Sequence, residues 1–304
     1  MINEKQILYL LTVAEEHNIT SAARKLYITQ PALSRMILDL EHSLDTALFI
    51  RDRGNLQPTQ AGEIYLAGCR EVLAVSRSVS KQLLDLSQSR TGKIRLGATA
   101  LTGEFLLPQL IDSFEQAFPN VELILMEGTM QELQDMVKSG KTDLALTYQT
   151  NDEELDYHMV LENPIYVQVP PSFAKKFPEW SPGTANPDIT PETLSGKPFI
   201  LLNKGRGMRE IAEQFLQNFS VTPCKIIETH NIHLANRLAA ADKGFTFIPS
   251  IALHPFMHSE KREFYCQIAG YPMKRTLYCC CRRNTYLTEA EHYLIQKIPT
   301  LFST

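Results

Sequence analysis

The stretch from Asn18 to Leu44 constrains the fold most, because it predicts two short helices joined by a tight turn. The Thr20 hydroxyl can cap the first helix, and Thr29 can cap the second. Pro31 falls in the opening turn of the second helix, where its missing N–H costs little. Apolar residues at helical spacing share one face of the second helix: Leu33, Ile37, Leu40 and Leu44. We expect this face to be buried in a small domain.

The other face of the second helix carries groups that form hydrogen bonds. It comprises Pro31, Ser34, Arg35 and Leu38, with Gln30 at its tip. An amide, a hydroxyl and a guanidinium at a helix N-terminus can reach base edges and phosphates in the major groove. A short apolar run that ends in Arg51 and a turn at Arg53 follow. They predict a two-stranded wing that carries both arginines toward phosphate or the minor groove.

Net charge does not by itself indicate a nucleic-acid partner, because residues 1–60 hold six cations and seven anions. The position of the cations is more informative than their number. Four of the six lie in the turn, the second helix and the wing. We expect DNA binding that weakens with salt, since contacts to phosphate release counterions.

Many positions of this region stand in a fixed register. Residues Ala22 to Glu41 read A-A-x-x-L-x-x-[ST]-Q-P-A-L-S-x-x-I-x-x-L-E, followed by L-F-x-R at Leu48–Arg51 and T-x-A-G at Thr59–Gly62. The segment resembles the winged helix-turn-helix of the LysR-type transcriptional regulators. This resemblance implies an all-α winged helix-turn-helix domain at residues 1–58 that binds double-stranded DNA. The DNA-binding residues it implies are Thr20, Gln30, Pro31, Ser34, Arg35, Arg51 and Arg53.

A long helical pattern without proline runs from Thr59 to about Ser87. Its apolar seam alternates steps of four and three residues, which is typical of a coiled coil. The resemblance implies that this linker helix, residues 59–90, pairs two subunits in a homodimer or homotetramer. The expected dimerisation residues are Tyr65, Cys69, Val72, Val79, Leu83 and Leu86. The alternative is a helix that packs on its own C-terminal domain.

After the small polar stretch Ser87–Gly92, strands and helices alternate, which argues for a mostly parallel α/β sheet. Strands are expected at 94–98, 121–126, 143–146, 164–169, 199–202, 225–228, 245–248, 264–268 and 276–281. Helices are expected at 106–118, 129–140, 208–218 and 232–241 and from 288 onward, whereas most of 173–198 is expected to be irregular.

Four segments of this part resemble landmarks of the periplasmic-binding-protein-like effector domain of the same family. They read LGATALTGEFLLP, EGTMQEL, LNKGRGMREI and ETHNIHLANRLAAADKGFTFIP. The resemblance implies a multidomain chain whose α/β effector domain spans residues 91–304. Subdomain I would comprise 91–163 plus 269–304, and subdomain II would comprise 164–268.

Ligands of open α/β sheets bind beyond the carboxyl ends of the strands, beside helix N-termini. Those ends carry hydroxyls, an amide and free backbone N–H groups here, which suits an anion. The expected effector is therefore a small carboxylate or an aromatic acid. By the family resemblance, the expected effector contacts are Thr99, Thr102, Thr129, Asn203, Thr229 and Phe245.

Catalytic and metal-binding patterns are missing from the sequence. It contains no G-x-S-x-G, H-E-x-x-H, G-x-x-x-x-G-K-[ST] or C-x-x-C. The three consecutive cysteines at 279–281 would alternate between the faces of a strand and cannot form a metal cage. His230 and His233 have only Glu228 nearby. We therefore expect no metal, no cofactor and no enzymatic activity.

The leading hypothesis is a cytoplasmic transcription regulator with RNA polymerase as a candidate partner. No apolar run approaches the ~20 residues that span a bilayer, and the first residues do not resemble a signal peptide. Two alternatives stay open. One is a DNA-binding redox switch like the peroxide-sensing branch of the family, which uses two cysteines in the first half of the second subdomain, where this sequence offers only Cys224. The other is a solute-binding protein or enzyme with a non-functional head.

Overall fold

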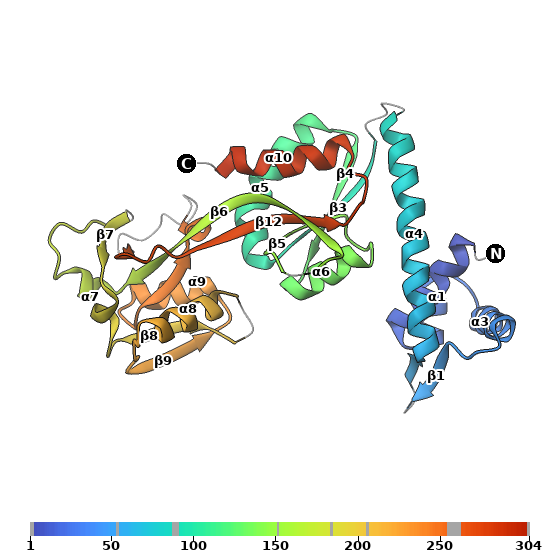
Figure 1. Cartoon of the computed structure of the whole chain (residues 1–304), viewed down its shortest axis with the longest axis horizontal. Coiled ribbons are helices and arrows are strands. Elements are labelled where there is room, and N and C mark those ends of the chain that lie inside the picture. The colour runs from blue at the N-terminus through green and yellow to red at the C-terminus, as the bar shows by residue number, and fades with distance from the viewer. Residues whose placement is uncertain are drawn as a thin grey trace.

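The computed structural model describes residues 3–52, 55–86, 91–150, 152–182, 185–204, 207–253 and 263–302. Figure 1 shows a small N-terminal head joined through one long helix to a larger α/β part. The head contains α1 (Glu4–Glu16), α2 (Ile19–Lys25), α3 (Gln30–Leu44), β1 (Phe49–Asp52) and β2 (Asn55–Pro58), and the long helix is α4 (Gln60–Leu86).

One apolar core holds the head together, and all of these elements contribute to it. Leu33 and Ile37 are the buried side chains that α3 contributes to this core, as the periodicity predicts. Leu40 is only half-buried and Leu44 is exposed, so the buried face of α3 is shorter than expected. The start of α4 completes the core through Leu66. The head and the first turns of α4 therefore form one packed unit.

The helix caps in the head differ from the prediction. Asn18 caps α2, because its side-chain oxygen accepts hydrogen bonds from the N–H groups of Thr20 (2.8 Å) and Ser21 (3.1 Å). The assignment of this cap to Thr20 was wrong, since Thr20 lies inside the helix. Thr29 occupies the N-cap position of α3 but makes no side-chain hydrogen bond there.

The α/β part consists of two lobes. The first lobe contains β3 (Gly92–Ala98), α5 (Ala100–Ala117), β4 (Val121–Glu127), α6 (Met130–Lys138), β5 (Leu144–Thr147) and α10 (Glu289–Phe302). The second contains α7 (Pro171–Ala174), β7 (Ala185–Ile189), β8 (Pro198–Leu202), α8 (Gly207–Asn218), β9 (Lys225–Thr229), α9 (Ile232–Ala240), β10 (Thr246–Pro249) and β11 (Phe264–Ile268), with short 3-10 turns at Pro191–Leu194 and Ser250–Leu253.

Two long strands join the lobes, β6 (Leu155–Val169) and β12 (Lys274–Arg282). The strand order is β4-β3-β5-β12-β6-β11-β7, with β10 also paired to β6 and with β8 and β9 paired separately. The chain leaves the first lobe along β6 and returns along β12, so these strands are antiparallel (Figure 1). The expectation of a mostly parallel sheet was wrong here, because the outward and return strands lie side by side.

Two further expectations need correction. The crossover strand predicted at 164–169 begins at Leu155 and tolerates Pro164, which pairs with Lys274. The segment expected to be irregular contains β7, which is parallel to β11. Its residues Ala185–Ile189 read ANPDI, and asparagine, proline and aspartate are depleted in strands. Pairing with the neighbouring strand therefore decides its conformation.

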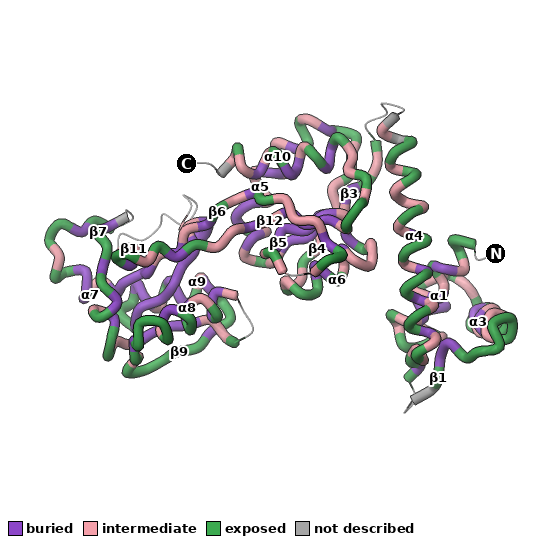
Figure 2. The backbone as a smooth tube through the Cα atoms, in the orientation of Figure 1, coloured by how far each residue is buried: buried purple, intermediate pink, exposed green. Residues whose placement is uncertain are grey.

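Each lobe has its own large apolar core. The first contains Leu106, Leu110 and Phe114 of α5, packed with residues of β3, β5 and α10. The second is built around Phe199, Phe215 and other aromatic side chains. Figure 2 shows that the buried residues concentrate in the sheet and on the inner faces of its helices. Within the residues that the structure describes, no helix could cross a membrane.

Candidate nucleic-acid interface and effector site

The turn between α2 and α3 positions the N-terminus of α3 at the surface. Tyr27 in this turn has a φ of 55°, in the left-handed region. Its side chain is 96% exposed, although tyrosine usually buries its ring. Tyr27 therefore adopts a backbone conformation that is unfavourable for a residue with a side chain, and it exposes its ring to solvent just before α3. The sequence motif did not reveal this feature.

The outward face of α3 carries most of the predicted DNA-binding residues. Gln30, Pro31 and Arg35 are exposed, Ser34 is half-buried, and Thr20 of α2 is exposed. Among the described residues, Arg35 makes no hydrogen bond or ion pair, so its guanidinium is available to a partner. The apolar Leu38 on the same face is 60% exposed. The face thus combines free polar groups with an apolar contact surface.

A carboxylate fixes the start of the wing relative to α3. Glu41 Oε1 accepts hydrogen bonds from the N–H groups of Leu48 (2.7 Å) and Phe49 (2.9 Å). Strands β1 and β2 then pair antiparallel, with Arg51 opposite Leu56. The side chain of Arg51 and the whole of Arg53 lie outside the described residues. Glu41 therefore couples the recognition helix to the wing. The sequence motif contains this residue but does not indicate this role.

Helix α4 presents an apolar stripe that differs in part from the predicted seam. Cys69 is only 3% exposed and packs with the half-buried Tyr65 against the core of the head. Val72, Val79 and Leu83 are exposed, and the side chain of Leu86 lies outside the described part. Ile64 and Val75 extend the exposed stripe at helical spacing. We define the α4 stripe as Ile64, Val72, Val75, Val79 and Leu83.

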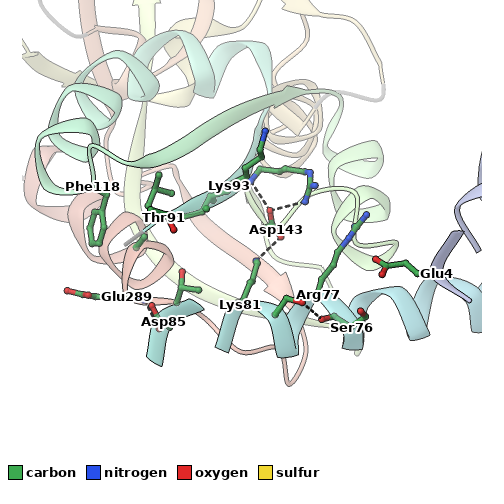
Figure 3. Close-up of a pocket in the computed structure, with 17 residues that line it drawn as sticks. Glu4, Ser76, Arg77, Lys81, Asp85, Thr91, Lys93, Phe118, Asp143 and Glu289 are labelled. Atoms are coloured by element: carbon green, nitrogen blue, oxygen red, sulfur yellow. Dashed lines mark hydrogen bonds and ion pairs between the residues drawn. The ribbon is translucent and has the colours of Figure 1, made fainter. Parts of the chain in front are cut away.

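The opposite side of α4 docks on the first lobe. Lys81 forms ion pairs with Asp143 (2.8 Å) and with Glu291, whose side chains are only 9% and 1% exposed. Figure 3 shows Lys81 directed from α4 toward Asp143. Burial alone would lower the pKa of Lys81, but Glu291 and Asp143 raise it above its usual value. Arg77 of α4 also donates to the carbonyl of Gly140.

A cavity of about 250 Å³ lies at this junction, between α4, β3 and the start of α10. Its lining mixes both charge signs, including Arg77 and Lys93 with Asp85 and Glu289 (Figure 3). The junction is therefore better explained as the surface on which the linker helix docks. Its mixed charges select neither an anionic nor a cationic ligand.

The effector residues predicted in the first lobe follow the ends of two neighbouring parallel strands, β3 and β4. Thr99 caps α5, and its hydroxyl donates to the Thr102 hydroxyl (3.0 Å). Tyr148 follows β5. Burial raises the pKa of Tyr148, and Arg275 and the Thr102 side chain oppose this shift. Thr129 caps α6 in a capping box with Glu132.

The effector residues predicted in the second lobe have different surroundings. Asn203 follows β8, and its amide lies 3.2 Å from the Nδ1 atom of His230. Thr229 accepts a hydrogen bond from the N–H of Asn231, which is an ordinary turn contact. Phe245 is 2% exposed and packs among aromatic rings in the core of this lobe. Its side chain is therefore occupied by packing.

A hydrogen bond joins a helix of the first lobe to a helix of the second. His233 Nε2 on α9 lies 2.8 Å from Glu104 Oε2 on α5. The His233 ring also lies 5.7 Å from the ring of Phe105. The contacts with Glu104 and Phe105 account for the position of the His233 ring, and no metal ion is needed to explain it. Glu228 forms an ion pair with the buried Arg209 (2.7 Å), so the set of His230, His233 and Glu228 does not converge on one point.

The cysteines provide neither a reactive thiol pair nor a metal site among the described residues. Cys69, Cys266, Cys279, Cys280 and Cys281 are buried, whereas Cys224 is exposed. Burial raises the pKa of Cys266, Cys280 and Cys281 to about 12 in each case. A thiol with so high a pKa is a poor nucleophile at neutral pH. Among the described residues, no group of histidine, cysteine or acidic side chains could hold a metal ion.

Sequence reasoning missed two residues near Thr102. Tyr148 follows a predicted strand, so the rule that ligands bind at strand ends could have identified it. Arg275 lies in β12 and belongs to no motif. Its guanidinium carbon lies 3.2 Å from the centroid of the Tyr148 ring. Only the folded arrangement of β12 beside β5 brings these two side chains together.

Known proteins share both parts of this architecture. Residues 5–63 match the family described as "Bacterial regulatory helix-turn-helix protein, lysR family", and residues 87–300 match the "LysR substrate binding domain". A curated relative is an uncharacterized HTH-type transcriptional regulator, YcgK of Bacillus subtilis, 27% identical over 295 residues that cover 92% of this chain and 89% of the relative.

Solved structures show the same fold. A full-length point variant of OxyR from Pseudomonas aeruginosa has a TM-score of 0.75 at 20% identity, covering 98% of this chain and 95% of that one. CbnR in complex with its target DNA has a TM-score of 0.61 at 17% identity, covering 99% of both chains. Together with the exposed recognition helix and the matched domains, these findings show that the chain is a DNA-binding transcription regulator of the LysR family.

Proposed function

We propose that this regulator binds DNA as a homodimer or homotetramer and responds to a small organic acid held between its lobes. The head (1–58) reads DNA, α4 within the linker (59–90) pairs subunits, and the effector domain (91–304) senses the ligand. The observation that carries the proposal is the free outward face of α3, with Arg35 exposed and without a partner among the described residues. A DNA-bound regulator acts in the compartment that holds the chromosome, and RNA polymerase is its candidate partner there.

The α4 stripe supports the pairing of subunits. Its five side chains are at least half exposed in a single chain, and an apolar stripe of this kind on one helix is stabilised by a partner helix. A second copy of α4 is the simplest partner, because it presents the same stripe and gives a symmetric interface. Such pairing would place two recognition helices on one duplex.

The arrangement of the lobes supports an effector response. The predicted contacts Thr99, Thr102, Thr129 and Asn203 lie at strand ends or helix starts, where an anion is favoured. Thr102, Thr229 and Phe245 are buried in this arrangement of the chain, so contact between a ligand and these three side chains stays a prediction. A ligand changes the balance of two lobe or subunit arrangements only if it binds one of them more tightly.

The test is selection of genomic DNA fragments by the full-length protein, followed by sequencing. Wild type should enrich a short interrupted palindrome, while Arg35→Ala should bind it about 10- to 100-fold more weakly, since a lost base contact costs about 1–3 kcal/mol. Arg237→Ala, which removes an exposed cation from α9, serves as the control and should bind normally. Equal enrichment by wild type and Arg35→Ala would refute the proposed interface.

A further inference from the structure

Arg275 lies where the two lobes meet. It stands on β12, which pairs with β5 of the first lobe and with β6 (Figure 1). Its guanidinium stacks on the ring of Tyr148, and Nη2 lies 4.0 Å from the sulfur of Met130, the first residue of α6. On the other side it contacts Gly207, the first residue of α8 in the second lobe. A Cβ atom at Gly207 would lie 1.9 Å from Nη2.

Arg275 forms no ion pair within the described part of the protein. No carboxylate of the described residues lies within 4.0 Å of its guanidinium, which meets the sulfur of Met130 and the ring of Tyr148, and Glu210 on α8 acts on its charge only from a longer distance. Arg209, by contrast, pairs with both Glu213 and Glu228. Burial lowers the pKa of Arg275 from its ordinary value, yet a guanidinium stays charged at neutral pH. Several of its five N–H donors thus remain available.

We infer that Arg275 binds the anionic group of the effector, a carboxylate, while Tyr148 holds the guanidinium in place through its ring. This inference rests on the proposed effector function and names the group that selects the ligand. A planar guanidinium can donate two parallel hydrogen bonds to a carboxylate, which gives both affinity and orientation. The hydroxyl of Thr99, which is half-buried at the start of α5, can receive a second polar group of the ligand.

The position of Arg275 gives the bound anion a role in regulation. The guanidinium contacts Tyr148 and Met130 in the first lobe and Gly207 in the second. A carboxylate that draws Arg275 into a bidentate contact changes how the side chain fills the space between the lobes. The ligand then favours one relative placement of the lobes over another.

The experiment compares carboxylates with their neutral amides on the full-length protein. Thermal shift and calorimetry are carried out with benzoate and benzamide, and with succinate and succinamide, at constant ionic strength. Carboxylates should stabilise wild type and the amides should not. Arg275→Gln should weaken carboxylate binding by about 10- to 100-fold, as expected for a lost charge-assisted contact. Lys274→Gln removes the neighbouring exposed cation and should bind as wild type does.

A second variant moves Arg275 without replacing it. In Gly207→Ala the new methyl group would displace the flexible end of Arg275, so carboxylate binding should weaken while the fold is kept. Equal binding by wild type and Arg275→Gln, equal binding of acids and amides, or no shift with any acid would overturn the inference. DNA selection by the same Arg275→Gln protein separates these outcomes. If the operator is still enriched, the regulator assignment stands and only the assignment of Arg275 fails.

Discussion

Glu41 is the residue that links DNA reading to the stability of the head. Its carboxylate accepts from two backbone N–H groups at the start of the wing, those of Leu48 and Phe49. Both residues are buried, so neither N–H has ready access to water. An unsatisfied buried N–H costs more than an average hydrogen bond contributes.

We predict that Glu41→Ala destabilises the head by about 2–4 kcal/mol, because two buried donors lose their acceptor. Urea unfolding followed by circular dichroism measures the change. Glu41→Gln keeps an oxygen acceptor and should recover much of the stability. If Glu41→Ala unfolds at the wild-type urea concentration, the wing is not held by this carboxylate.

The cysteines give a test of the redox alternative. Only Cys224 is exposed, so a thiol reagent should modify one cysteine per folded chain quickly and the other five after unfolding. Rapid modification of two or more thiols, or loss of DNA binding after mild peroxide, would favour a thiol switch instead.

Three buried thiols predict how stability depends on pH. The pKa of Cys266, Cys280 and Cys281 is about 12 in the folded chain, higher than the ordinary value of 9.0. As pH rises above about 9, the unfolded chain loses these protons first, so folding is progressively disfavoured. Stability against urea should therefore be unaffected by these groups below pH 9 and fall above it. A constant unfolding midpoint from pH 8 to 11 would contradict this interpretation.

At the scale of elements, α4 has two working faces. The α4 stripe is free in the single chain, and the opposite side docks on the first lobe through Lys81. In the proposed dimer, a single helix would therefore connect the pairing of subunits to the position of the effector domain. Each face can be tested without disturbing the other.

We predict that Val79→Glu converts the oligomer to smaller species, because it places a charge in the centre of the α4 stripe, where Val79 is 50% exposed. Light scattering at several protein concentrations measures the mass. Ala67→Glu, an exposed position beside the stripe, is the matched control and should keep the wild-type mass. An unchanged mass for Val79→Glu would remove the stripe from the interface.

The docking face gives a separate prediction. Lys81→Met should destabilise the folded chain by about 3–5 kcal/mol, because it leaves the buried carboxylate of Glu291 without a counter-charge, while Asp143 keeps only the longer ion pair with Arg95 (3.5 Å). Lys93→Met breaks the exposed pair with Glu122 and should cost at most about 1 kcal/mol. Denaturant unfolding compares the two. Similar small losses would show that the junction contributes little.

The sequence could predict elements whose pattern is local. The capping boxes at Thr129 and Thr288 and the buried face of α3 follow from spacing alone. The sequence could not predict which stripe of α4 is free, because Tyr65 and Cys69 fit the same heptad and their burial depends on the head. Nor could it place Arg275 beside Tyr148, since 127 positions separate them and strand pairing joins them.

At the scale of the whole molecule, binding must overcome an unfavourable net charge. The chain carries a formal charge of −4, yet the proposed interface presents cations toward the duplex. Specific binding should therefore weaken steeply with salt, with a log–log slope set by the number of phosphate contacts. Arg35→Ala should lower affinity most strongly for the specific site.

Two paired recognition helices are proposed to read one duplex. Hydroxyl-radical footprinting of a selected operator with the full-length protein measures where they lie. We predict two protected patches on one face of the DNA, centred about one helical turn or a multiple of it apart, and both lost in Arg35→Ala. A single protected patch, or two patches that persist in Arg35→Ala, would contradict it.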